Sequence, residues 1–109
     1  VHTALGPGLL ESVYETALAY ELREDGFEIQ TQLGIPVMYK DIELDQGYRM
    51  DLLVNNKVIV EIKSVDGLLD VHHKQLLTYL KLSNKKLGLL INFNVSSLKN
   101  HITRIVNNL

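Results

Sequence analysis

The chain has 109 residues, of which 46% are hydrophobic and 22% are charged, and its formal net charge is −2. This length fits a single domain over residues 1–109, because two domains would each have too small a core. The chain has no cysteine, which excludes disulfides and thiolate zinc sites. It also has no visible signal peptide and no apolar run near the ~18 residues of a membrane span, so we expect a cytoplasmic protein with no membrane partner. The net charge argues against a non-specific nucleic-acid coat, but it does not exclude an enzyme that carries a metal ion.

The first predicted element is a helix over residues 8–25, with Gly26 as a left-handed residue just past its end. A period-two alternation of apolar residues over 27–39 then predicts a half-buried strand. Pro36 cannot donate a hydrogen bond to a neighbouring strand, so this strand lies at a sheet edge or breaks there. A turn follows that contains Asp41, Glu43, Asp45 and Gly47.

Two more strands are predicted over residues 48–54 and 58–63, and the parity of their apolar residues fixes the loop between them. A two-residue loop would place the two apolar sets on opposite sides of the sheet. A three-residue loop pairs Val54 with Val58 and gives one continuous apolar face. We therefore predict the three-residue loop, which also places Asp51 directly opposite Glu61.

This register divides the hairpin into two faces. The apolar face is expected to hold Met50, Leu52, Val54, Val58, Val60 and Ile62. The other face is expected to hold Arg49, Asp51, Leu53, Ile59, Glu61 and Lys63.

The C-terminal half continues with a helix over residues 68–82 and a buried strand over 87–93. A strand, a helix and a strand of these lengths predict a right-handed crossover between parallel strands. The tail over 98–109 fits either a short helix or a strand over 102–106. The predicted fold class is α/β, with helices flanking a mixed sheet.

The opposed Asp51 and Glu61 suggest a metal site. Two carboxylates this close repel each other, and the pKa of one rises unless a cation lies between them. With no cysteine or histidine nearby, the natural cation is Mg²⁺ or Mn²⁺. Lys63, two residues on, could orient a water molecule or neutralise charge on a phosphate. A solvated sheet face with cross-strand pairs explains the same spacing equally well.

Two further polar residues interrupt apolar helix faces. Glu11 lies in the apolar arc of the first helix, where a carboxylate is costly unless it is paired or bound to a metal. Gln75 lies in the apolar arc of the second helix, with Tyr79 one turn later, and should form a hydrogen bond. The helical wheel alone slightly favours a Glu11 that reaches water beside Glu15, and a Gln75 at the edge of the core.

The chain resembles the GxxExxY proteins of the PD-(D/E)XK nuclease superfamily. The segments that carry the resemblance are GLLESVY at 8–14, RMDLLV at 49–54, VEIK at 60–63, QLLTYL at 75–80 and GLLINF at 88–93. They cover nearly the whole chain in the correct order. The resemblance implies a PD-(D/E)XK, restriction-endonuclease-like αβββαβ core.

The resemblance also implies roles for single residues. Asp51 matches the catalytic aspartate, Glu61 and Lys63 match the E-x-K motif, and Gln75 and Tyr79 are similar to the QxxxY motif of RecB-type nuclease domains. Asp51, Glu61 and the Ile62 carbonyl would hold Mg²⁺ or Mn²⁺. Glu11 would complete the site by holding a second ion or a water on the metal.

The sequence therefore favours a metal-dependent nuclease that hydrolyses phosphodiester bonds in DNA. One alternative is a catalytically silent module that keeps the nuclease fold to bind nucleic acid or a protein. A second alternative is a structural subunit that forms a homodimer, which an exposed apolar patch around the tail would favour.

Overall fold

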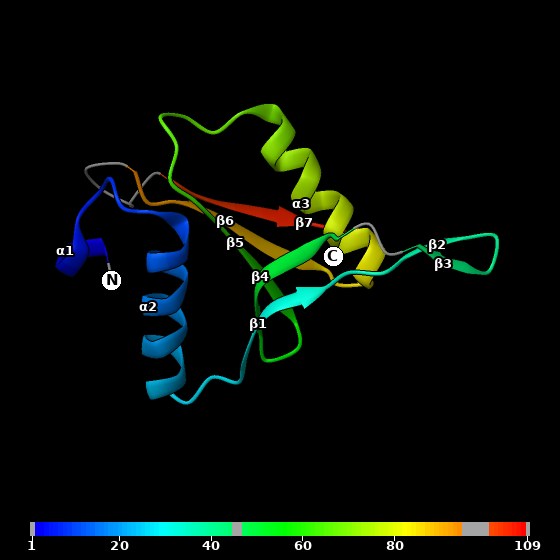
Figure 1. The fold of residues 1–109 in the computed structure, drawn as a ribbon, viewed down its shortest axis with the longest axis horizontal. Coiled ribbons are helices and arrows are strands. Elements are labelled where there is room, and N and C mark those ends of the chain that lie inside the picture. The colour runs from blue at the N-terminus through cyan, green and yellow to red at the C-terminus, as the bar shows by residue number, and fades with distance from the viewer. Residues whose placement is uncertain (1, 45–46, 95–100, 109) are drawn as a thin grey trace.

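The structure, a computed structural model, describes residues 2–44, 47–94 and 101–108 (Figure 1). A five-stranded mixed sheet with the strand order β1-β4-β5-β6-β7 forms its centre. Figure 1 shows α2 and α3 on opposite sides of this sheet, and each helix covers its own buried cluster. The predicted α/β class, a mixed sheet flanked by helices, is confirmed. No helix in the described ranges is both long enough and apolar enough to cross a membrane.

The N-terminal part forms two helices where the sequence predicted one. A short α1 (His2–Leu5) precedes α2 (Glu11–Glu24). Glu11 opens α2, where a negative side chain interacts favourably with the helix dipole. Gly26 follows the helix end with a φ of 91°, so the predicted left-handed residue is confirmed.

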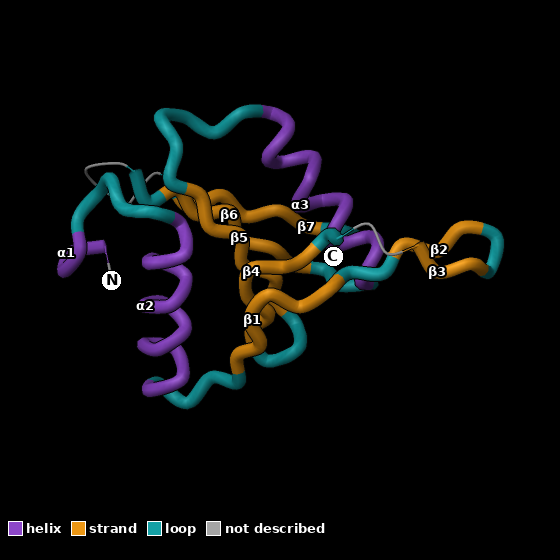
Figure 2. The backbone as a smooth tube through the Cα atoms, viewed as in Figure 1, coloured by secondary structure: helices purple, strands orange, loops and turns teal. Residues whose placement is uncertain are grey.

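The alternating segment breaks into two strands that belong to different sheets. Its first half is β1 (Ile29–Gly34), an edge strand of the large sheet, and Pro36 lies at the break. The second half is β2 (Val37–Tyr39), which pairs with β3 (Ile42–Leu44) in a separate hairpin. Figure 2 shows this β2–β3 hairpin projecting away from the other strands. The predicted turn after Tyr39 was therefore wrong in extent, because it contains β3.

The hairpin of β4 (Arg49–Val54) and β5 (Val58–Lys63) has the predicted register. Val54 pairs with Val58 across a three-residue loop. Asn55 and Asn56 have φ values of 51° and 57°, and the Lys57 N–H donates to the Val54 carbonyl at 3.0 Å. Asparagine adopts this left-handed backbone more readily than most residues, which fits the tight turn.

The faces of this hairpin depart from the prediction at two points. Leu52, Val60 and Ile62 pack in the cluster that includes Tyr14 and Ala19 of α2, as expected for an apolar face. The opposite face is not a solvated one, because α3 covers it and buries Leu53 and Ile59. Met50 also packs on that α3 side, where strict alternation would place it on the α2 side.

The backbone conformation of Gln32 explains why Met50 lies on the α3 side of the sheet. Gln32 has a φ of 50° in the middle of β1, and the β1–β4 pairing skips Gln32 and Asp51. The alternation of both strands changes side at this point. Ile29 accordingly packs on the α2 side and Leu33 on the α3 side.

The C-terminal elements resolve the ambiguous tail. After α3 (Asp70–Ser83), β6 (Leu87–Asn92) pairs parallel to β5, as predicted. The final strand β7 (Ile102–Val106) pairs antiparallel to β6, so residues 102–106 form a strand rather than a helix. The predictions for residues 98–100 and 109 lie outside the described residues.

Candidate functional site

Asp51 and Glu61 meet where the β4–β5 pairing ends. The last paired residues are Leu52 and Val60. Beyond them, the Asp51 N–H donates to Glu61 Oε1 at 3.2 Å, and the Ile62 N–H donates to Asp51 Oδ2 at 2.8 Å. The Asp51 carboxylate thus takes a backbone donor of β5 that would otherwise point towards a neighbouring strand. Both carboxyl groups are held at one end of the hairpin, as the register predicted.

The Glu61 carboxyl is buried, with only 5% of the residue exposed. Burial and, after it, the negative charge of the neighbouring Asp51 together raise its pKa from 4.5 to about 8. The positive charge of Lys63 opposes this rise only in part. A buried carboxyl beside a second carboxylate is an arrangement that a cation would stabilise, because it would neutralise both groups.

Lys63 and Tyr79 lie near this carboxyl pair. Lys63 ends β5, is half-buried, and its backbone carbonyl accepts the Phe93 N–H at 2.8 Å. Tyr79 of α3 is buried, and burial together with the charge of Glu61 raises the pKa of its hydroxyl. Its ring lies 5.9 Å from that of Tyr48, between ring centroids. Gln75, one turn earlier on α3, is exposed.

Glu11 forms its hydrogen bond away from the Asp51–Glu61 pair. Its Oε2 accepts the Ser64 N–H at 3.2 Å, and the Ser64 hydroxyl donates to the Leu9 carbonyl at 2.7 Å. Glu11 therefore contacts the segment that follows Lys63, and no hydrogen bond joins it to Asp51 or Glu61 in the described ranges. Within these ranges, no group of three or more acidic or histidine side chains is arranged to hold a metal ion.

Tyr14 anchors the loop that leads into Glu11. It is fully buried, its hydroxyl donates to the Gly6 carbonyl, and the Leu9 N–H donates to that hydroxyl at 3.1 Å. Its ring stacks on Phe93 with centroids 4.5 Å apart. The two side chains that the GxxExxY pattern specifies, Glu11 and Tyr14, thus both fasten this loop to the end of the sheet.

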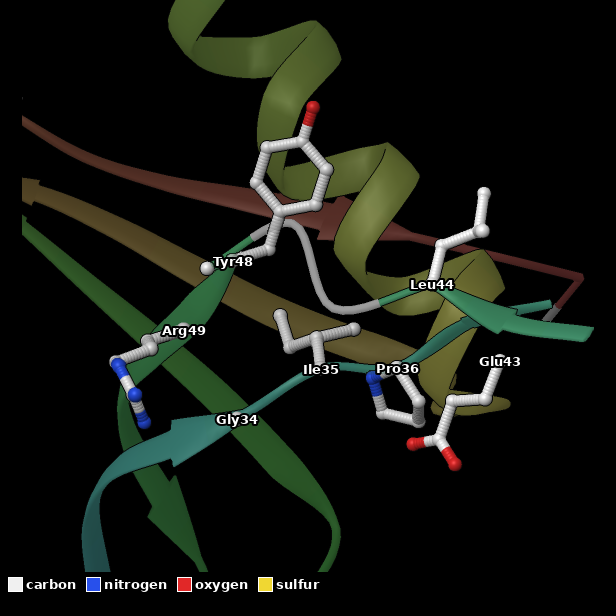
Figure 3. Close-up of a pocket in the computed structure, with 8 residues that line it drawn as sticks. Gly34, Ile35, Pro36, Glu43, Leu44, Tyr48 and Arg49 are labelled. Atoms are coloured by element: carbon white, nitrogen blue, oxygen red, sulfur yellow. The ribbon is translucent and has the colours of Figure 1, made fainter.

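A cavity of about 300 Å³ lies between the end of β1, the β2–β3 hairpin and the start of β4. Its lining residues are Gly34, Ile35, Pro36, Glu43, Leu44, Gly47, Tyr48 and Arg49. Figure 3 shows Arg49 and Glu43 at opposite ends of this group, with Ile35 between Tyr48 and Pro36. Asp51, Glu61 and Lys63 are not among the lining residues, so the cavity does not contain the carboxyl pair.

A sequence model of the PD-(D/E)XK nuclease superfamily matches residues 1–105. The chain belongs to the PD-(D/E)XK nuclease superfamily. Neither the curated proteins nor the solved structures yield a match to it. PD-(D/E)XK nucleases generally use divalent metals. The oxygen atoms of Asp51 and Glu61 suit such hard cations, and the raised pKa of Glu61 fits a group that binds one.

The sequence did not single out three residues that hold the Asp51–Glu61 pair and the segment after Lys63. The Gln32 amide donates to both carboxylate oxygens of Glu15 at 2.9 and 3.1 Å, and to Asp51 Oδ1 at 3.3 Å. Glu15 follows Glu11 by one helical turn, so both lie on one helix face, and this spacing could have identified Glu15. The alternation of apolar residues over 27–39 does not distinguish Gln32 from its neighbours.

Asn92 is the third supporting residue, and it holds the segment after Lys63. Only 1% of it is exposed, its Nδ2 donates to the Val65 carbonyl at 3.0 Å, and its Oδ1 accepts the Val65 and Asn94 N–H groups at 3.2 Å each. The signal in the sequence is a polar residue inside the apolar run at 87–93.

Proposed function

We propose that the protein is a nuclease that uses Mg²⁺ or Mn²⁺ to hydrolyse phosphodiester bonds in DNA. The observation that carries the proposal is the contact between Asp51 and the buried Glu61, whose pKa rises to about 8 without a cation. Asp51, Glu61 and the Ile62 carbonyl would hold the ion. When bound, it would supply positive charge to the phosphate and make water a better nucleophile at neutral pH.

The neighbouring side chains then have distinct tasks. Lys63 positions the attacking water and stabilises the negative charge that develops on the phosphate in the transition state. Tyr79, buried beside Glu61, steadies the carboxyl pair, and the exposed Gln75 is free to contact phosphate. Glu11 is assigned to the site through Ser64, since its carboxylate holds the backbone that follows Lys63. A second ion or a water at Glu11 stays a prediction.

A catalytically silent module that binds nucleic acid or a protein is the second candidate. Two observations favour it. Glu11 is turned to the Ser64 N–H, and the described part of the chain holds no group of three or more acidic or histidine side chains that could bind a metal ion. This module would keep the PD-(D/E)XK fold, and divalent cations would not stabilise it.

Calorimetry with Mn²⁺ and cleavage of plasmid DNA test the proposal together. We expect the wild-type protein to bind Mn²⁺ and to nick DNA, and Asp51→Asn to lose both while keeping its fold. Asp66→Asn is the matched control, because Asp66 is an exposed aspartate just beyond Ser64 and Val65, and both properties should stay intact. A wild-type protein that binds no divalent ion would reject the nuclease and favour the silent module. An RNA substrate measured in parallel tests the choice of DNA.

The finer points of family and location belong to the same proposal. We assign the chain to the GxxExxY proteins, supported by the contacts of Glu11 and Tyr14 with the loop at 6–11 and with Ser64. We also keep the cytoplasm as its compartment.

A further inference from the structure

Gln32 has a backbone conformation that its side-chain type does not favour. Its φ of 50° lies in the left-handed region, although it stands in the middle of β1. The other described non-glycine residues with such φ values lie in turns, at the end of α3 or after β7. A left-handed residue other than glycine is strained, and strain inside a strand is often kept for the sake of a functional side chain.

The Gln32 side chain joins two carboxylates from different elements. Its amide nitrogen lies 2.9 and 3.1 Å from the two oxygens of Glu15 on α2, and 3.3 Å from Oδ1 of Asp51 on β4. Carboxylates only accept hydrogen bonds, so their presence fixes the NH₂ group, and not the amide oxygen, on this side. Gln32 thus links the first long helix to the metal-site aspartate.

Asp51 is held from two directions as a result. Its Oδ2 accepts the Ile62 N–H from β5, and its Oδ1 accepts the Gln32 amide from β1. The β1–β4 pairing skips both Gln32 and Asp51, so neither residue is held there by the regular ladder. The orientation of the Asp51 carboxylate therefore depends on these two donors.

We propose that Gln32 is a positioning residue of the site, which orients Asp51, and that Glu15 acts on Asp51 through Gln32. The role of Asp51 as a metal ligand rests on the proposed function, whereas the hydrogen bonds that orient its carboxylate do not. Partners that orient a metal ligand typically change metal affinity about 10–100-fold when they are removed.

Replacing Gln32 by glycine separates positioning from stability. Glycine adopts a positive φ without strain, and this gain opposes the loss of the side-chain hydrogen bonds and the greater freedom of glycine in the unfolded chain, so Gln32→Gly should stay folded without metal. Its affinity for Mn²⁺, measured by calorimetry, should fall about tenfold or more. Lys40→Gly is the matched control, because Lys40 has a φ of 47° in the β2–β3 turn. It should likewise stay folded and keep the wild-type affinity, and unchanged affinity in Gln32→Gly overturns the proposal.

A second variant tests whether the loss of Mn²⁺ affinity in Gln32→Gly comes only from a more flexible backbone. Gln32→Met keeps the length and the strained backbone but has no donor for Asp51. It should lose Mn²⁺ affinity to a similar extent as Gln32→Gly. Wild-type affinity in Gln32→Met would show that the amide donor is not needed, and the proposal would then be wrong.

A double-mutant cycle tests the part assigned to Glu15. Glu15→Gln should weaken Mn²⁺ binding several-fold in the wild-type background, and should have no further effect in Gln32→Gly. An equal loss in both backgrounds would mean that Glu15 acts through its own charge, and would overturn the link through Gln32.

Hydrogen exchange without metal distinguishes this inference from the nuclease proposal. The Ile62 N–H donates to Asp51 Oδ2, so it should exchange about fivefold faster in Gln32→Gly if Asp51 becomes free to turn. The Val60 amide is the internal control and should not change. Unaltered Ile62 exchange rejects the positioning role even if the protein cleaves DNA. Faster exchange supports it even if the wild-type protein binds no Mn²⁺.

Discussion

The Glu61 carboxyl carries a proton at neutral pH when no cation is bound, because burial and the adjacent Asp51 raise its pKa to about 8. Asp51, half-buried, accepts hydrogen bonds from the Ile62 N–H and the Gln32 amide. A divalent cation must displace the Glu61 proton to bind both carboxylates.

The first prediction concerns the pH dependence of stability without metal. The pKa of Glu61 is raised on folding. Its stabilising contribution to the free energy of unfolding is therefore fully present below about pH 4.5 and is lost as the pH rises to about 8. Chemical denaturation in EDTA should show the wild-type protein losing stability relative to Glu61→Gln between pH 5 and pH 8. A stability difference that stays constant over this range would contradict the raised pKa.

The second prediction concerns Lys63, which separates the enzyme from the silent module. Lys63→Met keeps the aliphatic stem and removes the charge, so the fold and the Mn²⁺ affinity should stay nearly intact. DNA cleavage should fall by about two to three powers of ten, the usual loss for one electrostatic stabiliser. Lys57→Met, in the turn at the other end of the same hairpin, should cleave like the wild type. Full cleavage by Lys63→Met would remove its catalytic assignment.

At the scale of the elements, the close packing of α3 on β6 determines the position of Tyr79. A Cβ atom built on Gly88 of β6 would lie 3.1 Å from three side-chain atoms of Leu76 on α3. Leu76 is itself buried, with 1% exposed, so it has little room to move. Glycine at position 88 therefore allows α3 to approach the sheet closely, and Tyr79 follows Leu76 by less than one turn of that helix.

The third prediction is that Gly88→Ala destabilises the protein by about 1–3 kcal/mol, the usual cost of overpacking a tight core. Gly67→Ala is the control, because a Cβ there meets nothing within 4 Å. Urea denaturation measures both. Leu76→Val in the Gly88→Ala background should recover part of the loss, and an additive double variant would contradict a clash between these two residues.

At the scale of the whole molecule, the net charge of −2 makes the approach of a DNA backbone depend on the cation. The fourth prediction is that Mg²⁺ tightens duplex binding by Lys63→Met, the variant expected to cleave much more slowly, at least about tenfold over EDTA. Fluorescence anisotropy at several salt concentrations measures this, and the salt dependence should be shallow because few phosphates are neutralised. Equal binding with and without Mg²⁺ would favour the silent module.

The regular parts of this fold were predictable from the sequence. The parity of Val54 and Val58 gave the correct loop, and the resulting register brought Asp51 beside Glu61. The sequence left a helix and a strand open for residues 102–106, because five residues satisfy either period. Only their pairing with β6 decides for the strand.

The irregular parts were not predictable, for physical reasons. A φ of 50° at Gln32 is a tertiary effect, so neither the displaced Met50 nor the link from Glu15 to Asp51 follows from a pattern of period two. The partner of Glu11 is a backbone N–H at Ser64, far away in the sequence and invisible to any motif. The β3 strand was missed because it has only three residues, two of them exposed, and so carries little burial signal.

The short loop of the β4–β5 hairpin also has a consequence for the order of folding. Hairpins of this kind close within microseconds, whereas the parallel pairing of β5 with β6 requires the whole crossover through α3. We therefore expect Asp51 and Glu61 to meet early, while water still surrounds both. The dehydration that raises the pKa of Glu61 is then expected in a later step, when α3 packs over the sheet, so a cation present during folding would reach the carboxyl pair before the helix covers it.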